Sequence, residues 1–258
     1  MDASQASHVN LMRFAAMATE LADGGEIDDS GDELLYCDRH PFAFFSGAIR
    51  SHSRDDGAEL VARADAWFDE REREWVLTAR NTGEDAPLEA AAEAAGLVKV
   101  LDRYPAMGAE HRLEAPPSPG LRLRPVEDEA DAVAFWRVCA LAYPAIGFPA
   151  DAFDRFPTAT LLHEASAAFL GEVEGAPVAT AMTAVLDGVG FVGWVGTTEA
   201  ARGRGAGAAI TVAATNAAFD RGASLASLQA SPMGESIYAR LGYGELFNYR
   251  LWARPRGA

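Results

Sequence analysis

The stretch VGTTEAARGRGAGA, residues Val195–Ala208, decides the fold of this chain. It predicts a strand, a short turn and a glycine-rich loop that opens a helix. Three glycines and two arginines lie between Arg202 and Gly207. Glycines let a backbone approach a ligand closely and adopt positive φ angles, and the first amides of a helix attract anions. The stretch therefore predicts a binding site for a phosphate or pyrophosphate, to which the two arginines add positive charge.

Two segments of the chain resemble one known family. The spacing Arg-x-x-Gly-x-Gly at Arg202, Gly205 and Gly207 resembles the acyl-CoA-binding signature of the GNAT superfamily of N-acyltransferases. The segment SPMGESIYARLGY, Ser231–Tyr243, is similar to that family's next helix, with a tyrosine four residues before a Gly-aromatic pair. The resemblance covers about residues 120–258 and implies an α/β (α+β) GNAT fold, a mixed central sheet flanked by helices, with acetyl-CoA as acyl donor.

The resemblance also implies roles for individual residues. Val195–Thr197 takes the place of the family's strand that pairs with the pantetheine arm, and its backbone N–H groups are expected to hold an oxyanion. Tyr238 takes the place of a general acid that protonates the leaving thiolate, with an ordinary helix tyrosine as the alternative. The implied donor-binding residues are Val195, Gly196, Thr197, Arg202, Gly203, Arg204, Gly205, Ala206, Gly207 and Ala208.

The glycine loop has two other interpretations. Gly203, Gly205 and Ala208 also satisfy the dinucleotide-binding fingerprint, which is weak when it stands alone. A Rossmann unit places an acidic residue at the end of the next strand, and the predicted strand Leu225–Ala230 contains none. The remaining alternative is a glycine-rich helix start that packs closely on a neighbouring element.

A proline-rich segment divides the chain nearly in half. Residues 114–120 contain three prolines and a glycine, which is typical of a linker. We therefore expect a first domain at 1–113 and a catalytic domain at 121–258. The elements predicted after the linker are helices at Ala130–Tyr143 and 150–164, three antiparallel strands at Phe169–Val173, Val178–Val185 and Phe191–Gly196, a helix from Gly205 to Arg221, a parallel strand at Leu225–Ala230, a helix at Met233–Leu241 and a strand at Leu246–Ala253.

The first half of the chain resembles a faded copy of the second. A helix is predicted at 58–72, a strand at Trp75–Ala79 and a helix at Leu88–Ala95. A shift of 148 places Arg54–Glu59 on Arg202–Gly207, and a shift of 146 places Ala92 on Tyr238. The Arg-x-x-Gly frame survives at Arg54 and Gly57, but Asp55, Asp56 and Glu59 would repel a pyrophosphate, and Ala92 replaces the tyrosine. We therefore predict a degenerate GNAT-like domain without acyl-CoA binding, in tandem with the catalytic one. An unrelated α/β domain is the alternative.

Other reactive side chains carry little signal. The carboxylates considered as general base are Glu164, Glu172, Glu174 and Asp187, and each fits a surface residue better, so no base is assigned. His163 fits a structural role. Cys139 lies among apolar helix residues and is predicted to be an inert buried thiol. The histidines and cysteines show no metal-binding spacing, so no metal is expected.

Four aromatic residues have two interpretations of equal weight. In the family the acceptor pocket is built by the first helices of the domain and the central strands. Tyr143, Phe148, Phe153 and Trp194 fall in those segments and either line the acceptor side or pack in the core.

Composition bounds the class of function. The formal net charge of −16 over 258 residues argues against nucleic-acid and anionic-membrane partners. It is compatible with a cationic substrate and fits a solvated acidic surface better. No signal pattern or apolar membrane span is seen, and two cysteines make no disulfide framework, so a cytoplasmic protein is expected. The sequence therefore predicts an acetyl-CoA-dependent N-acetyltransferase of a small-molecule amine. A non-catalytic acyl-CoA-binding sensor or assembly module is the alternative, and homodimerisation is left open.

Overall fold

The structure, a computed structural model, describes residues 1–40, 42–52 and 57–254. The chain divides into two compact units, each built from two stretches of sequence. Unit 1 comprises Met1–Asn10 and Met107–Glu245, and unit 2 comprises Leu11–Ala106 and Leu246–Ala258. The elements that contribute residues to both units are α1 (Ala3–Glu20), β5 (Val98–Ala109) and β11 (Gly244–Ala253).

This division differs from the predicted boundaries at 1–113, 114–120 and 121–258 in three places, at residues 10–11, 106–107 and 245–246. Strand β11 pairs antiparallel with β4 (Val76–Arg80), so the end of the chain belongs to unit 2. The first ten residues belong to unit 1, where Asn10 Nδ2 donates to the Val189 carbonyl at 2.9 Å. The linker at 114–120 lies inside unit 1, and the chain changes unit at residues 10–11, 106–107 and 245–246.

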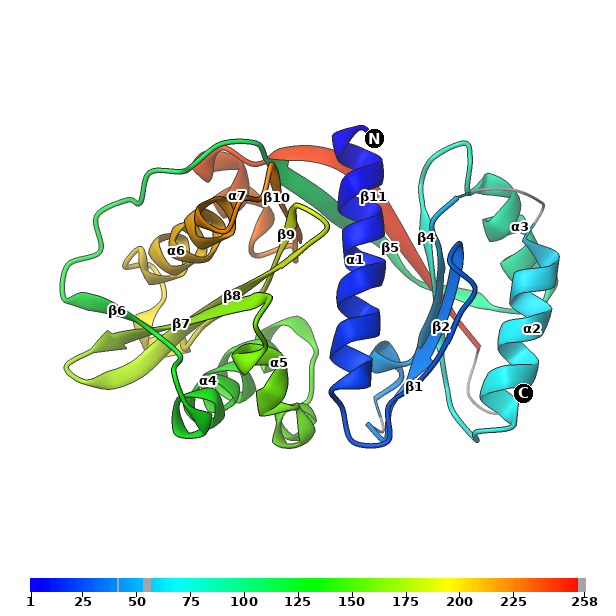
Figure 1. The fold of residues 1–258 in the computed structure, drawn as a ribbon, viewed down its shortest axis with the longest axis horizontal. Coiled ribbons are helices and arrows are strands. Elements are labelled where there is room, and N and C mark those ends of the chain that lie inside the picture. The colour runs from blue at the N-terminus through cyan, green and yellow to red at the C-terminus, as the bar shows by residue number, and fades with distance from the viewer. Residues whose placement is uncertain (41, 53–56, 255–258) are drawn as a thin grey trace. The chain divides into compact units, whose positions relative to one another are not determined.

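Unit 1 contains a sheet in the order β10-β9-β8-β7-β6, with helices on both faces (Figure 1). Its strands are β6 (Leu121–Pro125), β7 (Ser166–Val173), β8 (Ala176–Leu186), β9 (Val189–Thr197) and β10 (Leu225–Gln229). Strands β6 to β9 pair antiparallel, and β9 and β10 pair parallel. This arrangement confirms the predicted three-strand meander and the predicted parallel strand after the helical crossover.

The helices of unit 1 follow the expected order along the chain. They are α4 (Glu129–Ala142), η2 (Tyr143–Ile146), η3 (Ala150–Arg155), α5 (Thr158–Leu162), η4 (Glu199–Ala201), α6 (Ala206–Asp220) and α7 (Glu235–Leu241). The predicted helical region at 150–164 contains two short helices, because Phe156 before Pro157 is extended, with ψ of 133°, and separates η3 from α5. Helix α6 packs on one face of the sheet and α4 on the other (Figure 1).

Unit 2 also has a sheet between helices. Its strands run in the order β1-β2-β3-β4-β11-β5, and Leu34 and Leu35 of β2 point to opposite faces, as neighbours in a strand do. Leu34 packs with Met12 of α1, whereas Leu35 packs with Leu60 of α2. The remaining elements are β1 (Glu26–Asp29), β2 (Glu33–Cys37), η1 (Ala43–Phe45), β3 (Gly47–Arg50), α2 (Ala58–Asp69) and α3 (Ala86–Ala94).

The two units repeat one supersecondary pattern. In unit 1 the parallel strands β9 and β10 are joined by α6, and in unit 2 the parallel strands β3 and β4 are joined by α2. Gly205 caps α6 with φ of 84°, and Gly57 caps α2 with φ of 80°. This match confirms the predicted shift of 148 at Gly57. Arg54–Asp56, also part of that alignment, lie outside the described residues.

A buried ion cluster lies at the carboxyl ends of β3 and β4. Arg80 Nε and backbone N both donate to Asp85 Oδ2, at 3.0 and 2.9 Å. Arg50 Nε lies 3.6 Å from Asp85 Oδ1. The side chains of Arg50, Arg80 and Asp85 are 2%, 5% and 1% exposed, so two guanidinium groups share one carboxylate away from water.

Replacing Asp85 with asparagine is expected to destabilise unit 2. The substitution leaves two buried guanidinium groups without their shared charge, and breaking a buried pair from one side costs about 3–5 kcal/mol. Urea denaturation measures the loss. The control is Glu84→Gln, because the Glu84 side chain is 68% exposed at its ion pair with Arg80 and exposed pairs contribute about 0–1 kcal/mol. Equal losses in the two variants contradict the stabilising role of the cluster.

Candidate functional site

Strand β9 carries a bulge at Trp194 and Val195. Met182 of β8 pairs with Gly193 and Thr180 pairs with Gly196, so two residues of β9 oppose one residue of β8. Trp194 adopts φ of 51°, which is unusual for a residue with a side chain. The Thr180 hydroxyl donates to the Trp194 carbonyl at 3.0 Å and fixes the bulge. The bulge redirects the backbone of the predicted segment Val195–Thr197.

On its other edge, away from β8, strand β9 separates from β10. Their parallel register runs from Val189 opposite Leu225 to Phe191 opposite Ser227, and β9 then continues to Thr197. The second half of β9 is therefore not in register with β10. A backbone edge of this kind can hydrogen-bond an extended ligand, as an added strand would.

The start of α6 lies next to the end of β9. Gly203 and Gly205 have φ angles of 73° and 84°, so both need the freedom of glycine. A Cβ on Gly207 would lie 2.9 Å from Thr197 Oγ1, so the helix approaches the strand closely only because this residue has no side chain. The first turn of α6 contains no acidic residue. Its free amides and helix dipole therefore favour an anion.

The sequence predicts that Arg202 adds positive charge at the anion site, whereas in the structure its side chain donates hydrogen bonds to two backbone carbonyls. Its Nε donates to the Thr197 carbonyl at 3.1 Å, and its Nη2 donates to the Ala142 carbonyl at 3.1 Å. Arg202 therefore ties the loop to the end of β9 and to the end of α4. Arg204 is exposed, and its carbonyl accepts from the Ser118 hydroxyl at 3.0 Å. The linker thus braces the glycine loop.

Tyr238 lies on α7 and is 9% exposed. It packs in the core cluster that contains Val192 of β9 and Ala206 of α6. Gly234 permits this position, because a Cβ there would lie 2.6 Å from the Tyr238 ring. The neighbouring Tyr243 hydroxyl is 2.6 Å from Thr215 Oγ1, and burial raises the pKa of Tyr243. Tyr238 and Tyr243 thus belong to one core cluster with residues of β9 and α6, and the Tyr243 hydroxyl is engaged by Thr215.

The carboxylates considered as a general base lie on the surface or in ion pairs. Glu164 is exposed, and Glu174 and Asp187 are exposed turn residues with positive φ. Glu172 accepts from Arg124 Nε at 2.6 Å and from Arg122 Nη2 at 2.9 Å, and these hydrogen bonds lower its pKa.

The two other reactive side chains considered from sequence are engaged within unit 1. His163 Nδ1 accepts from the Ala165 amide at 3.1 Å, which gives this histidine a local structural role. Burial raises the pKa of the Cys139 thiol to about 12, so this cysteine is inert as predicted.

Six aromatic side chains gather beside the bulge. The Trp194 ring lies 5.8 Å from Tyr143 and 6.1 Å from Phe153, centroid to centroid, and Phe148 lies 5.6 Å from Tyr143. This cluster thus contains all four aromatic residues singled out from the sequence. Trp136 and Phe156, which sequence reasoning missed, lie 5.5 and 4.7 Å from Trp194. Both residues lie in the segment between β6 and β7. This position is the only feature of the sequence that could have identified them as part of the cluster.

The corresponding helix start in unit 2 is covered by a side chain. A Cβ on Gly57 would lie 2.6 Å from Leu88 Cδ1, so Leu88 of α3 packs directly on this glycine. Glu59 in the first turn of α2 adds negative charge. Both features disfavour an anion there. Among the described residues, no group of three or more His, Cys, Asp or Glu side chains is placed to hold a metal ion.

The helices described here include none that could cross a membrane, by length and apolar content.

Comparisons with known proteins place this geometry in context. The model of the acetyltransferase (GNAT) family matches residues 130–243, which include β7 to β10, α6 and α7. No curated protein matches the sequence significantly.

Solved structures with similar folds cover nearly the whole chain. A GCN5-related N-acetyltransferase from Kribbella flavida superposes with a TM-score of 0.75 at 23% identity, covering 97% of this chain and 96% of that one. A tandem GNAT protein from the clavulanic acid biosynthesis pathway gives 0.62 at 15% identity, covering 98% and 96%. A GCN5-related N-acetyltransferase from Sphaerobacter thermophilus gives 0.65 at 18% identity, covering 97% and 94%. Residues 130–243 therefore match the acetyltransferase (GNAT) family, and the chain shares its fold with GNAT proteins over nearly its whole length.

Proposed function

We propose that this protein transfers an acetyl group from acetyl-CoA to the primary amine of a small molecule by direct transfer. The observation that carries the proposal is that β9 parts from β10 right beside the glycine-bracketed start of α6. The backbone edge of β9 that is not paired with β10 suits an extended pantetheine arm, and the start of α6 suits a pyrophosphate. The family match supports acyl transfer from CoA, and acetyl is the simplest acyl group of that class.

The residues around the α6 start fit the donor. Gly203 and Gly205 supply the positive φ angles of the loop, and Gly207 lets α6 approach Thr197 closely. The first amides of the helix have no intrahelical partner and are available to an anion. Val195–Thr197 pairs with the amide groups of the arm in this proposal. Acetyl-CoA, when bound, supplies a thioester whose carbonyl carbon is open to attack by an amine.

Two groups of the chain assist the transfer. Backbone N–H groups of Val195–Thr197 stabilise the negative charge that develops on the carbonyl oxygen. Tyr238 donates a proton to the departing sulfur. Among the described residues no carboxylate is assigned as general base, because those considered lie on the surface or in ion pairs. The amine loses its proton to water in this scheme.

The acceptor side is lined by the aromatic cluster around Trp194. Aromatic faces bind organic cations and apolar groups, and the formal net charge of −16 favours a cationic molecule over an anionic one. We therefore propose a small, cationic amine as the acceptor and the cytoplasm as the place of reaction.

A second candidate is a non-catalytic acyl-CoA-binding sensor or assembly module. The observation that favours it is the missing base among the described carboxylates. The two candidates share the donor site and differ in turnover, so an amine panel assayed with acetyl-CoA separates them.

The Gly205→Glu variant is expected to lose acetyl-CoA binding, because a carboxylate at the α6 start repels a pyrophosphate. Isothermal titration calorimetry on the wild type and the variant measures the effect. Gly205→Gln is the matched control, because glutamine has the size of glutamate, meets the Pro117 carbonyl oxygen in the same way and carries no charge. Wild-type binding that survives in Gly205→Glu, or that is lost equally in both folded variants, contradicts the proposed site. Thermal unfolding checks that each variant is folded.

The Tyr238→Phe variant is expected to lower kcat by about 100-fold or more, the usual contribution of a positioned acid, while acetyl-CoA binding is unchanged. Steady-state kinetics with the amine found in the panel measure both. Tyr243→Phe is the control, because its hydroxyl contacts Thr215 in the core and its loss is expected to reduce stability by about 1 kcal/mol. An unchanged kcat in Tyr238→Phe rules out the proposed acid.

A further inference from the structure

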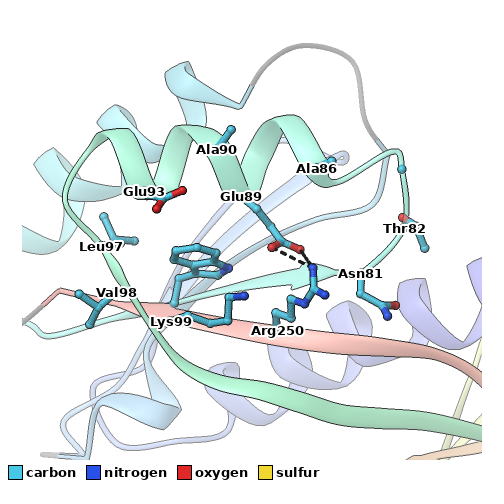
Figure 2. A pocket seen from close by; sticks show the side chains of 12 residues that line it. Asn81, Thr82, Ala86, Glu89, Ala90, Glu93, Leu97, Val98, Lys99 and Arg250 are labelled. Carbon is cyan, nitrogen blue, oxygen red and sulfur yellow. Dashed lines mark hydrogen bonds and ion pairs between the residues drawn. The ribbon is translucent and has the colours of Figure 1, made fainter.

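Unit 2 contains a cavity of about 750 Å³ between α3 and the strands β5 and β11 (Figure 2). One wall is a single face of α3, with Ala86, Glu89, Ala90 and Glu93 at helical spacing. The floor includes Arg250 and side chains of β5 and β11. The volume lies within the range of small-molecule sites. Every lining residue belongs to unit 2, so the cavity is separate from the site around β9 and α6.

The positive charges of the cavity are already balanced by the protein. Arg250 Nη1 contacts both carboxylate oxygens of Glu89, at 3.1 and 3.2 Å. Asp102 pairs with Lys99 Nζ at 3.0 Å and with Arg250 Nε at 3.2 Å. The side-chain carboxylate of Glu93 has no hydrogen bond or ion pair with any described residue. The charge left unbalanced in the cavity is therefore negative, and a ligand that complements it is a cation.

Figure 2 shows Glu89 and Glu93 extending from the same side of α3 toward the strands below it. Glu89 is held by Arg250, whereas Glu93 ends in the open part of the cavity. An ammonium group placed at Glu93 therefore meets one carboxylate directly and a second one turn away along the helix.

Two buried polar atoms of the lining lack a hydrogen-bond partner among the described residues, which is a second indication of a ligand. Trp252 is 7% exposed, and its indole Nε1 has no hydrogen-bond partner among the described residues. Thr82 Oγ1, at the other end of the cavity, is also without one in the described part of the chain. Buried polar groups are normally satisfied by protein, water or ligand. The Lys99 ammonium lies 5.3 Å from the centroid of the Trp252 ring, so this indole already faces a cation.

We propose that this cavity is a binding site for a small organic amine. Its ammonium group pairs with Glu93, and its apolar body lies along Ala90 and Leu97. A hydroxyl or carbonyl group on the ligand satisfies the Trp252 indole N–H or the Thr82 hydroxyl. With this site, unit 2 binds a ligand of its own. The proposal does not depend on whether unit 1 transfers acetyl groups.

Calorimetric titration of the full chain with tyramine and 4-hydroxyphenylacetate tests the proposal. The two probes share a hydroxyphenyl ring and carry opposite charges. Tyramine is expected to bind, and 4-hydroxyphenylacetate is not. Glu93→Gln is expected to weaken tyramine binding at least 10-fold. Glu59→Gln, an exposed glutamate in the first turn of α2, is the matched control and leaves tyramine binding unchanged.

A second variant protects the test from loss of folding. Ala90 is exposed on α3, so Ala90→Phe fills the cavity while the chain keeps its fold, and it is expected to abolish tyramine binding. Absence of tyramine binding at low millimolar concentration overturns the proposal. So does tyramine binding that is unchanged in both Glu93→Gln and Ala90→Phe. Tyramine binding in Tyr238→Phe is expected to match the wild type, so failure of the proposed transfer is distinguishable from failure of this site.

Discussion

The parting of β9 from β10 is the constraint on which the proposed chemistry of unit 1 depends. Parallel pairing that continued past Phe191 and Ser227 would consume the backbone groups that a ligand needs. The bulge at Trp194 turns the strand, and the Thr180 hydroxyl holds the Trp194 carbonyl in place. Arg202 then fixes the loop that follows, because its guanidinium group bridges the ends of β9 and α4. A few polar contacts thus keep an exposed backbone edge beside a helix start.

Unit 2 repeats the strand–helix–strand order of unit 1, but side chains occupy the strand ends and the helix start that are open to a ligand in the proposed site of unit 1. The carboxyl ends of β3 and β4 are filled by Arg50, Arg80 and Asp85, and Leu88 covers the glycine that begins α2. Burying charge is costly unless it is paired, so these three side chains stay together and fill the space at the ends of the two strands. The backbone topology is shared, and the side chains at the strand ends decide whether a ligand edge exists.

Local patterns in the sequence predicted local structure well. The glycine spacing located the caps of α2 and α6, and the periodicity of apolar residues located the strands β7 to β9, because both depend on neighbours in the chain. The pairing of β11 with β4 was not predictable, since Asn248 and Asn81 are hydrogen-bonded across 167 positions. The bulge at Trp194 depends on the register with β8, and the ion pairs of Glu172 depend on β6. The roles of Tyr238 and the donor-binding residues stay predictions, because contacts alone do not reveal turnover.

The place of β11 has a consequence for how the protein is made. A ribosome releases the chain from its first residue onward, and domains generally fold as units during synthesis. Here β4 emerges early, and its partner Leu246–Ala253 emerges only after Met107–Glu245 of unit 1. Until then the growing chain carries an incomplete sheet, whose open edge is a template for pairing with other chains. Unit 2 is therefore completed only after Met107–Glu245 of unit 1 has been synthesised, and a chain that stops before Leu246 lacks a strand of unit 2.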